Sequence, residues 1–178
     1  MNICIIPARG GSKRIPRKNI KDFAGKPMIE WSISAAIEAN CFDRIIVSTD
    51  DIEISDFAKS LSVEVPFIRP SSLSEDYTPT AAVVRHALKW LDLPQALDIN
   101  ACCLYATAPF VSSSDICESL LILKSQPCDF VLPVTSYAFP VQRALTMEQT
   151  TTLLKMREPD EFSIKSLVPS NIEPIGAP

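Results

Sequence analysis

The chain has 178 residues, 47% of them apolar, and a formal net charge of −4 at pH 7. This length suits one domain with a sizeable core, and no apolar run is long enough to span a membrane. The N-terminus lacks the basic region and cleavage site of a secretory signal, which predicts a cytoplasmic protein. The sequence has one histidine, His86, and no Cys-x-x-Cys pair, so a zinc site is disfavoured and the six cysteines are expected to be buried, reduced thiols.

Short apolar runs alternate with amphipathic segments in the order typical of a parallel sheet with helices on both faces. Strands are expected at residues 2–6, 44–49, 63–68, 101–105 and 129–134. Helices are expected at residues 27–40 and 81–91. Another is expected to begin at a capping box of Asp50 and Glu53 and to reach Leu61, and a fourth to follow a cap at 112–114. The fourth strand is apolar throughout, which predicts a central position. The rhythm ends at residue 135, and 151–156 is expected to form one strand of a hairpin.

A basic loop separates the first strand from the first helix. From Arg9 to Lys26 there are seven Lys or Arg and one acid, a local charge of +6, so the rest of the chain sums to −10. Concentrated positive charge on an acidic protein points to a discrete anion such as a phosphate chain. Gly10 and Gly11 allow a sharp turn that presents N–H groups to an anion. The position also fits, because α/β sheets bind phosphates beyond the carboxyl ends of their strands.

Two common phosphate-binding loops do not match this sequence. A Walker A loop needs Gly-Lys-Ser/Thr, with a glycine five residues before the second Gly, whereas here the order is Gly11-Ser12-Lys13 and the earlier position is Ile6. The dinucleotide fingerprint needs three spaced glycines, and this loop has one adjacent pair. A loop of solvated charge that binds nothing remains an alternative.

The loop and two later segments resemble a known family. The run from Ile6 to Lys13, with Lys18-Asn19 and Gly25-Lys26-Pro27, is similar to the opening motif of the cytidylyltransferases that activate nine-carbon acidic sugars as CMP-sugars. Within that family, the runs Tyr105–Phe110 and Phe139–Leu145 resemble the pseudaminic acid enzymes. The resemblance implies a Rossmann-like, mostly parallel sheet of the nucleotide-diphospho-sugar transferase type, flanked by helices, with a dimerisation arm after the fifth strand.

The resemblance also implies a reaction and its residues. The anomeric hydroxyl of the sugar would attack the α-phosphate of CTP and release pyrophosphate, with Mg²⁺ and basic residues neutralising charge. Catalytic roles are implied for Arg9 and Lys18. Contacts with the nucleotide are expected from Ala8, Gly10, Gly11, Ser12, Lys13, Asn19, Arg69 and Thr80. Contacts with the sugar are expected from Tyr105, Thr107, Gln142 and Arg143, the last because an acidic sugar requires a cation.

The loop at residues 69–80 has two interpretations. In related enzymes an Arg-Pro-x-x-Leu loop closes over the cytosine, and Arg69 can donate to the O2 and N3 acceptors of that base. The alternative is an ordinary connection capped by Thr80.

Other functions stay open. A sialic or legionaminic acid enzyme would share these motifs, as would an inactive, truncated CTP-binding form. Enzymes for the eight-carbon sugar acid carry Gly-Asp-Glu-Pro where this chain has Thr107-Ala108-Pro109, which disfavours that substrate. Nucleic-acid binding is disfavoured because few aromatic residues flank the basic loop.

The expected organisation is a nucleotide-binding core at 1–135, a sugar-pocket and dimerisation arm at 136–160, and an irregular tail at 161–178. A homodimer is implied, with CTP and an acidic sugar as ligands and no membrane partner. The metal ligands are not identified, since residues 157–178 contain no counterpart of the family's Asp-containing segment. Either the chain is a shorter form or further residues follow.

Overall fold

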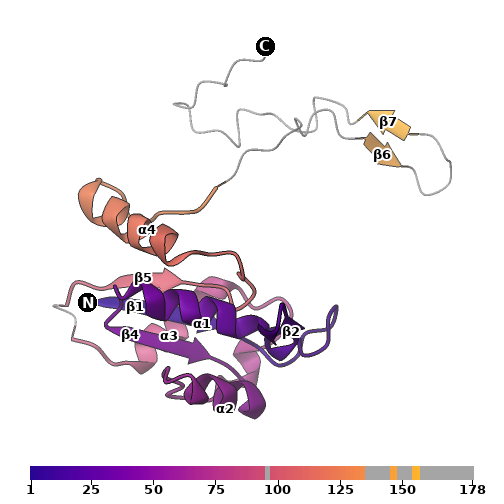
Figure 1. Cartoon of the computed structure of the whole chain (residues 1–178), viewed down its shortest axis with the longest axis horizontal. Helices are drawn as coiled ribbons and strands as arrows, with labels where there is room; N and C mark the ends of the chain where they lie inside the picture. Colours follow the sequence, from indigo (N-terminus) through magenta and orange to yellow (C-terminus); the bar gives the residue numbers. More distant parts are fainter. Residues whose placement is uncertain (95–96, 135–144, 148–153, 157–178) are drawn as a thin grey trace. The chain divides into compact units, whose positions relative to one another are not determined.

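The computed structural model describes residues 1–94, 97–134, 145–147 and 154–156 (Figure 1). The chain divides into two compact units, Met1–Leu132 and Pro133–Pro178. No helix in the described part combines the length and the apolar character needed to cross a membrane.

In the second unit, β6 (Leu145–Met147) and β7 (Leu154–Met156) pair in antiparallel register, with Thr146 opposite Lys155. The hairpin strand predicted at 151–156 is therefore confirmed for its last three residues. The first three lie outside the described residues, as do Gln142 and Arg143.

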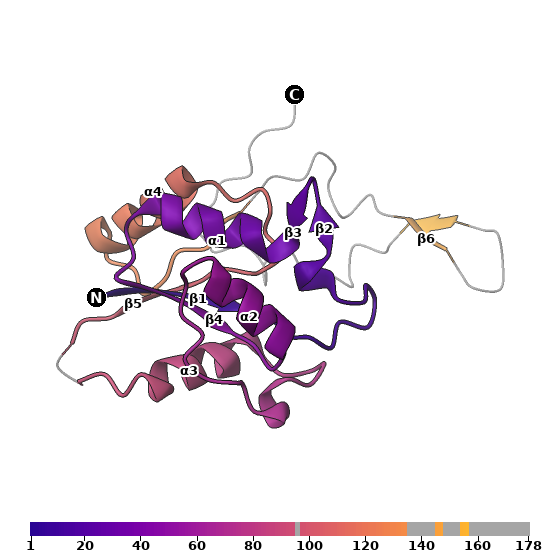
Figure 2. The same cartoon turned by 60° about the horizontal axis from the view of Figure 1, so that its bottom comes forward.

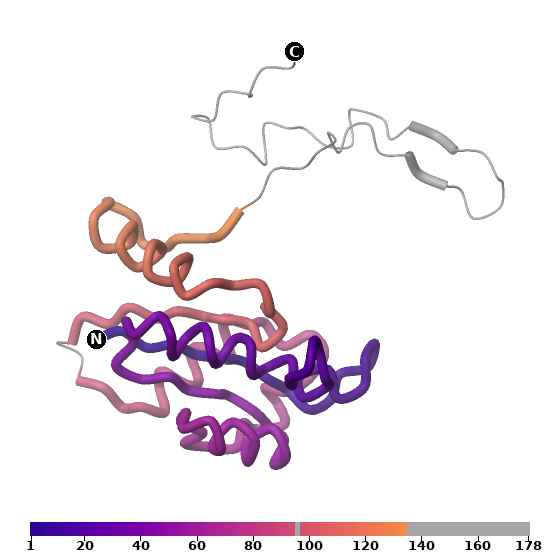
Figure 3. The backbone as a smooth tube through the Cα atoms, in the orientation of Figure 1, coloured from indigo at the N-terminus to yellow at the C-terminus, as the bar shows by residue number. Residues whose placement is uncertain are grey.

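The first unit is built on a sheet of three parallel strands in the order β4-β1-β5 (Figure 1), and Figure 3 traces the backbone in the same orientation. These strands are β1 (Asn2–Pro7), β4 (Arg44–Ser48) and β5 (Asn100–Cys103). β1 is paired on both sides, with Ile5 opposite Ile46 and Cys103. The predicted parallel α/β sheet is confirmed, but the central position predicted for residues 101–105 is wrong, because β5 is an edge strand of the described sheet.

Helices cover both faces of this sheet (Figure 2). They are α1 (Met28–Ala39), α2 (Ile52–Ser60), α3 (Thr80–Trp90) and α4 (Ser113–Ser125). Successive side chains of β1 alternate between the two layers, so Cys4 and Ile6 pack with α1, α2 and α4, whereas Ile3 and Ile5 pack with α3. Each fully buried isoleucine stabilises the fold by about 1.5–3 kcal/mol. This core fixes the strand ends from which the candidate site is built.

Short elements fold the basic loop against the start of α1. They are η1 (Lys18–Ile20), β2 (Asp22–Phe23) and β3 (Lys26–Pro27). Ala24 and Gly25 join β2 to β3 with φ values of 53° and 86°, the left-handed pair typical of a tight hairpin turn. The Met28 N–H donates to the Lys21 carbonyl at 3.0 Å and closes the loop.

The strand predicted at 63–68 is wrong. Only two isolated parallel bridges form there, Ile46 with Glu64 and Thr49 with Ile68. Pro66 lies between them and has no N–H to donate, so the ladder is interrupted. The segment nevertheless stays beside β4, and the Arg69 N–H donates to the Thr49 carbonyl at 2.7 Å.

The strand predicted at 129–134 is also absent from the described structure. Phe130, Leu132 and Val134 are exposed, although their apolar character suggested a buried strand. An apolar run becomes a strand only where a neighbouring strand accepts its hydrogen bonds, and the described backbone pairs this run with none.

Two smaller predictions also need correction. Asp51, rather than Asp50, caps α2, accepting a hydrogen bond from the Ile54 N–H at 3.1 Å. The cysteines are free, but only Cys4 is buried, whereas Cys103, Cys117 and Cys128 are exposed. The predicted cap of α4 is confirmed, since Ser112 and Asp115 form a capping box.

Candidate nucleotide site

A cavity of about 210 Å³ opens beyond the carboxyl ends of β1 and β5. The loop from Arg69 to Thr80 forms another part of its wall and includes η2 (Ser71–Leu73). The predicted site residues that line it together are Arg9, Ser12, Lys18, Asn19, Arg69, Thr80, Tyr105 and Thr107. Residues almost 100 positions apart thus meet at the strand ends, where α/β proteins bind nucleotides.

Gly10 lies against the start of α2. A Cβ added to Gly10 would lie 2.8 Å from the Asp51 Cβ, closer than packed side chains approach. A Cβ at Gly11 would meet no atom within 4 Å. The need for glycine at position 10 therefore comes from the close approach of Asp51, whereas position 11 is open.

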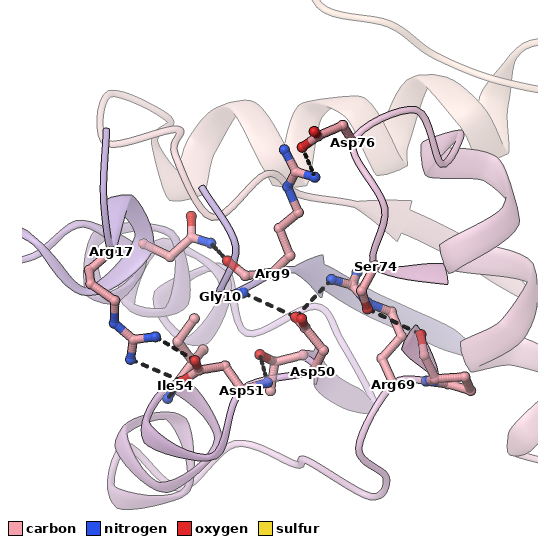
Figure 4. A network of polar contacts seen from close by, with 12 residues as sticks. Arg9, Gly10, Arg17, Asp50, Asp51, Ile54, Arg69, Ser74 and Asp76 are labelled. Carbon is pink, nitrogen blue, oxygen red and sulfur yellow. Dashed lines mark hydrogen bonds and ion pairs between the residues drawn. The ribbon is translucent and has the colours of Figure 1, made fainter. Parts of the chain in front are cut away.

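The Gly10 amide, which the sequence assigned to a phosphate, donates to the Asp50 carboxylate at 3.0 Å (Figure 4). Asp50 is the second residue after β4 and also faces the Arg69 guanidinium, at 3.4 Å from Nη2. One carboxylate thus joins the basic loop to the loop that carries Arg69. Its position just after a strand end was the sequence signal that could have identified it.

Arg17 and Asn19 hold the basic loop in place. The Arg17 guanidinium pairs with Asp51 and Glu53 at the start of α2, with one bond of 3.0 Å from Nη2 to Asp51. The hydrogen bond from Arg17 lowers the pKa of Asp51 below its ordinary value, so that carboxylate stays charged at neutral pH. The buried Asn19 side chain donates to the Arg9 carbonyl at 2.8 Å and fixes the backbone from which Arg9 projects.

Arg69 is buried, with 4% of its surface exposed, yet it lines the cavity. Its Nε donates to the Ser74 hydroxyl at 3.1 Å and its Nη2 faces Asp50 (Figure 4). Burial lowers the pKa of the Arg69 guanidinium, and the Asp50 carboxylate opposes that shift. Nη1 makes no hydrogen bond within the described residues, which leaves its donors available to a ligand.

Arg9 and Lys13 converge on a single carboxylate. Arg9 Nη1 lies 2.8 Å from Asp76 Oδ1, and the Lys13 ammonium pairs with the other oxygen of the same side chain. Hydrogen bonds from Lys13 and Arg9 hold the pKa of Asp76 below its ordinary value. Sequence reasoning missed Asp76, because only the fold brings it next to a residue 67 positions away.

On the opposite wall, the Tyr105 hydroxyl lies 3.2 Å from the Thr80 hydroxyl. Thr80 is the first residue of α3 and Tyr105 follows β5, so this contact joins the predicted nucleotide side of the cavity to the predicted sugar side. Tyr105 is exposed, which leaves its ring accessible from the cavity.

The described residues contain no group of three or more His, Cys, Asp or Glu that could hold a metal ion. Asp50 and Asp76, two carboxylates beside the basic loop, face cationic side chains instead. They do not form a ready metal site, and the Mg²⁺ requirement stays a prediction.

The chain is similar to known cytidylyltransferases over most of its length. A family model described as "Cytidylyltransferase" matches residues 3–170. The chain is 40% identical to a pseudaminic acid cytidylyltransferase of Campylobacter jejuni over 157 residues, which is 88% of this chain and 68% of that protein. It is 36% identical to a CMP-N,N'-diacetyllegionaminic acid synthase of Legionella pneumophila over 125 residues, 68% of this chain and 53% of that protein.

A solved structure shows the same fold. It is that of a CMP:2-keto-3-deoxy-manno-octonic acid synthetase complexed with CTP, with a TM-score of 0.57. The sequence identity is 23%, and the match covers 71% of this chain and 48% of that one. At this identity the likeness supports the α/β architecture alone.

Proposed function

The chain belongs to the cytidylyltransferase family, and we propose that it transfers CMP from CTP to the anomeric hydroxyl of pseudaminic acid and releases pyrophosphate. The observation that carries this proposal is the cavity at the strand ends. It brings together Arg9 and Lys18 from the basic loop with Arg69 from the loop that precedes α3. A nucleotide needs cations beside its triphosphate and hydrogen-bond donors beside its base.

In the proposed reaction, Arg9, Ser12, Lys13 and Lys18 hold the phosphates of the magnesium complex of CTP. Phosphoryl transfer needs positioning and charge neutralisation more than covalent help, so fixed cations beside the α-phosphate stabilise the transition state directly. The hydrogen bond from Asn19 supports this role, because it fixes the Arg9 backbone.

Arg69 is proposed to recognise the base. Its position is fixed by Ser74 and Asp50, and its Nη1 donors are available in the cavity wall. Cytosine presents acceptors at O2 and N3, whereas uracil carries a proton at N3. A fixed donor at that position would therefore favour CTP over UTP.

The sugar is proposed to lie against Tyr105 and Thr107, which line the cavity. Gln142 and Arg143 lie outside the described residues, and their contact with the sugar is proposed from the family resemblance. Tyr105 offers a ring face beside its hydroxyl, which suits a sugar that carries both amide and methyl groups. Arg143 is proposed as the partner of the sugar carboxylate, since a bidentate pair gives orientation as well as energy.

We expect pyrophosphate release when the chain is incubated with CTP, Mg²⁺ and pseudaminic acid, and much slower release with legionaminic or N-acetylneuraminic acid. Chelation of the metal by EDTA should stop the reaction, because MgCTP is the proposed substrate. Turnover with N-acetylneuraminic acid alone would overturn the choice of sugar. Turnover undiminished by EDTA would overturn the choice of MgCTP.

We also propose that residues 136–160 serve as a sugar-pocket and dimerisation arm after a nucleotide-binding core at 1–135, with 161–178 as a tail. The support is the antiparallel pair of β6 and β7, together with apolar residues outside the strand and helix rhythm of the core. Light scattering of the full chain at high concentration should give twice the mass of 19.6 kDa. A strictly monomeric mass would contradict a dimerisation arm at residues 136–160.

A further inference from the structure

Asp76 occupies a place that the proposed function gives to phosphates. Its two carboxylate oxygens are shared between Arg9 and Lys13, at 2.8 Å from Arg9 Nη1. It lines the same cavity, and its side chain is 30% exposed at the rim. An oxygen anion between two cations from the basic loop resembles a bound phosphate in charge and in donor geometry.

We propose that Asp76 is a competing internal anion, which neutralises Arg9 and Lys13 in the nucleotide-free protein and must leave them when the triphosphate binds. This inference rests on the proposed function. Asp76 and the phosphates are both negative, so they repel one another and compete for the N–H donors of Arg9 and Lys13. When pyrophosphate leaves, Asp76 forms its ion pairs with Arg9 and Lys13 again.

The segment that carries Asp76 can move without disturbing the core. Its neighbours Glu75 and Tyr77 are exposed, Tyr77 with 97% of its surface in solvent. The nearest described backbone bond is local, from the Thr78 N–H to the Glu75 carbonyl at 3.3 Å. Releasing Asp76 therefore breaks two ion pairs at the surface and exposes no buried apolar side chain.

The consequence is a site that holds phosphates less tightly than its cations would allow. Displacing Asp76 reduces the binding free energy that a ligand gains from its phosphate contacts. Pyrophosphate has no base to contact Arg69, so nothing offsets that reduction. The carboxylate should therefore promote the release of pyrophosphate after the reaction.

The test is calorimetric titration in metal-free buffer of the full chain with pyrophosphate, CTP and cytidine. Asp76→Asn should bind pyrophosphate and CTP about threefold to tenfold more tightly than the original chain, the range expected for removing two exposed ion pairs. Cytidine affinity should not change, because that ligand has no phosphate. Asp76→Ser, which removes the charge with a smaller side chain, should behave like Asp76→Asn.

Glu75→Gln is the matched control. Glu75 also lines the cavity and carries the same charge, but forms no ion pair among the residues that the structure describes. Its removal should change pyrophosphate affinity by less than about twofold, through long-range charge alone.

Each other result counts against the inference. Weaker or unchanged pyrophosphate binding in both Asp76 variants would overturn it, and so would an equal gain in the Glu75 variant. Failure of the original chain to bind CTP at all would instead contradict the proposed function.

Discussion

Replacement of Arg9 or Lys18 by alanine is expected to lower the rate of pyrophosphate release by at least about 100-fold, the range observed when a preorganised charge-stabilising donor is removed. Both side chains line the cavity, and neither belongs to the apolar core. The bond from Asn19 to the Arg9 carbonyl involves the backbone, so it should persist in the alanine variant. The loss should appear in kcat, measured by a coupled pyrophosphate assay at saturating CTP.

Lys21→Ala is the control for this pair. Lys21 lies in the same loop and carries the same charge as Lys18, but it is exposed and does not line the cavity. Its removal should change kcat less than about threefold, since exposed charges away from a site contribute little. Equal thermal unfolding midpoints would show that all three variants are folded. Wild-type turnover in both the Arg9 and the Lys18 variants would contradict a catalytic role for the basic loop.

Removal of Arg69 should have the second large effect, on the choice of base. The original chain should bind CTP at least about tenfold more tightly than UTP, because a donor that faces the N3 proton of uracil leaves two polar groups unsatisfied. Arg69→Ala should bring the two affinities to within about threefold. Arg69→Lys should also lose selectivity while retaining charge, since an ammonium cannot reproduce the planar fork.

Calorimetric titration with CTP, UTP and ATP measures this directly. The lysine variant separates base recognition from charge, because it keeps a cation near Asp50. If the original chain bound the three nucleotides equally, Arg69 would have no part in reading the base.

The sequence predicted strands and helices correctly where the apolar residues of the local pattern are those that the folded core buries. The run Asn2–Pro7 and the helix Met28–Ala39 carry apolar residues at the spacing of their elements, and the structure buries them. Residues 63–68 and 129–134 have equally apolar patterns without the regular strands predicted for them. Strand formation depends on a paired neighbour, and a single segment does not specify that neighbour.

The site shows the same division. The family motif located the loop and most of the cavity lining, including Arg69 and Thr80 from a distant segment. It did not indicate which of two adjacent carboxylates would cap α2: in the fold Asp51 accepts the Ile54 N–H, whereas Asp50 accepts the N–H of the distant Gly10. Nor could it indicate the pairing of Asp76 with Arg9 and Lys13, which exists only after the chain has folded.

The central claim is that CMP passes from CTP to the sugar acid, and product analysis by ³¹P NMR tests it most directly. With CTP, Mg²⁺ and pseudaminic acid, each CTP consumed should give one pyrophosphate and one phosphodiester of CMP joined to the sugar. Omission of the acid should leave CTP intact. Formation of free CMP or of CDP, or binding of CTP without any phosphodiester, would contradict the account.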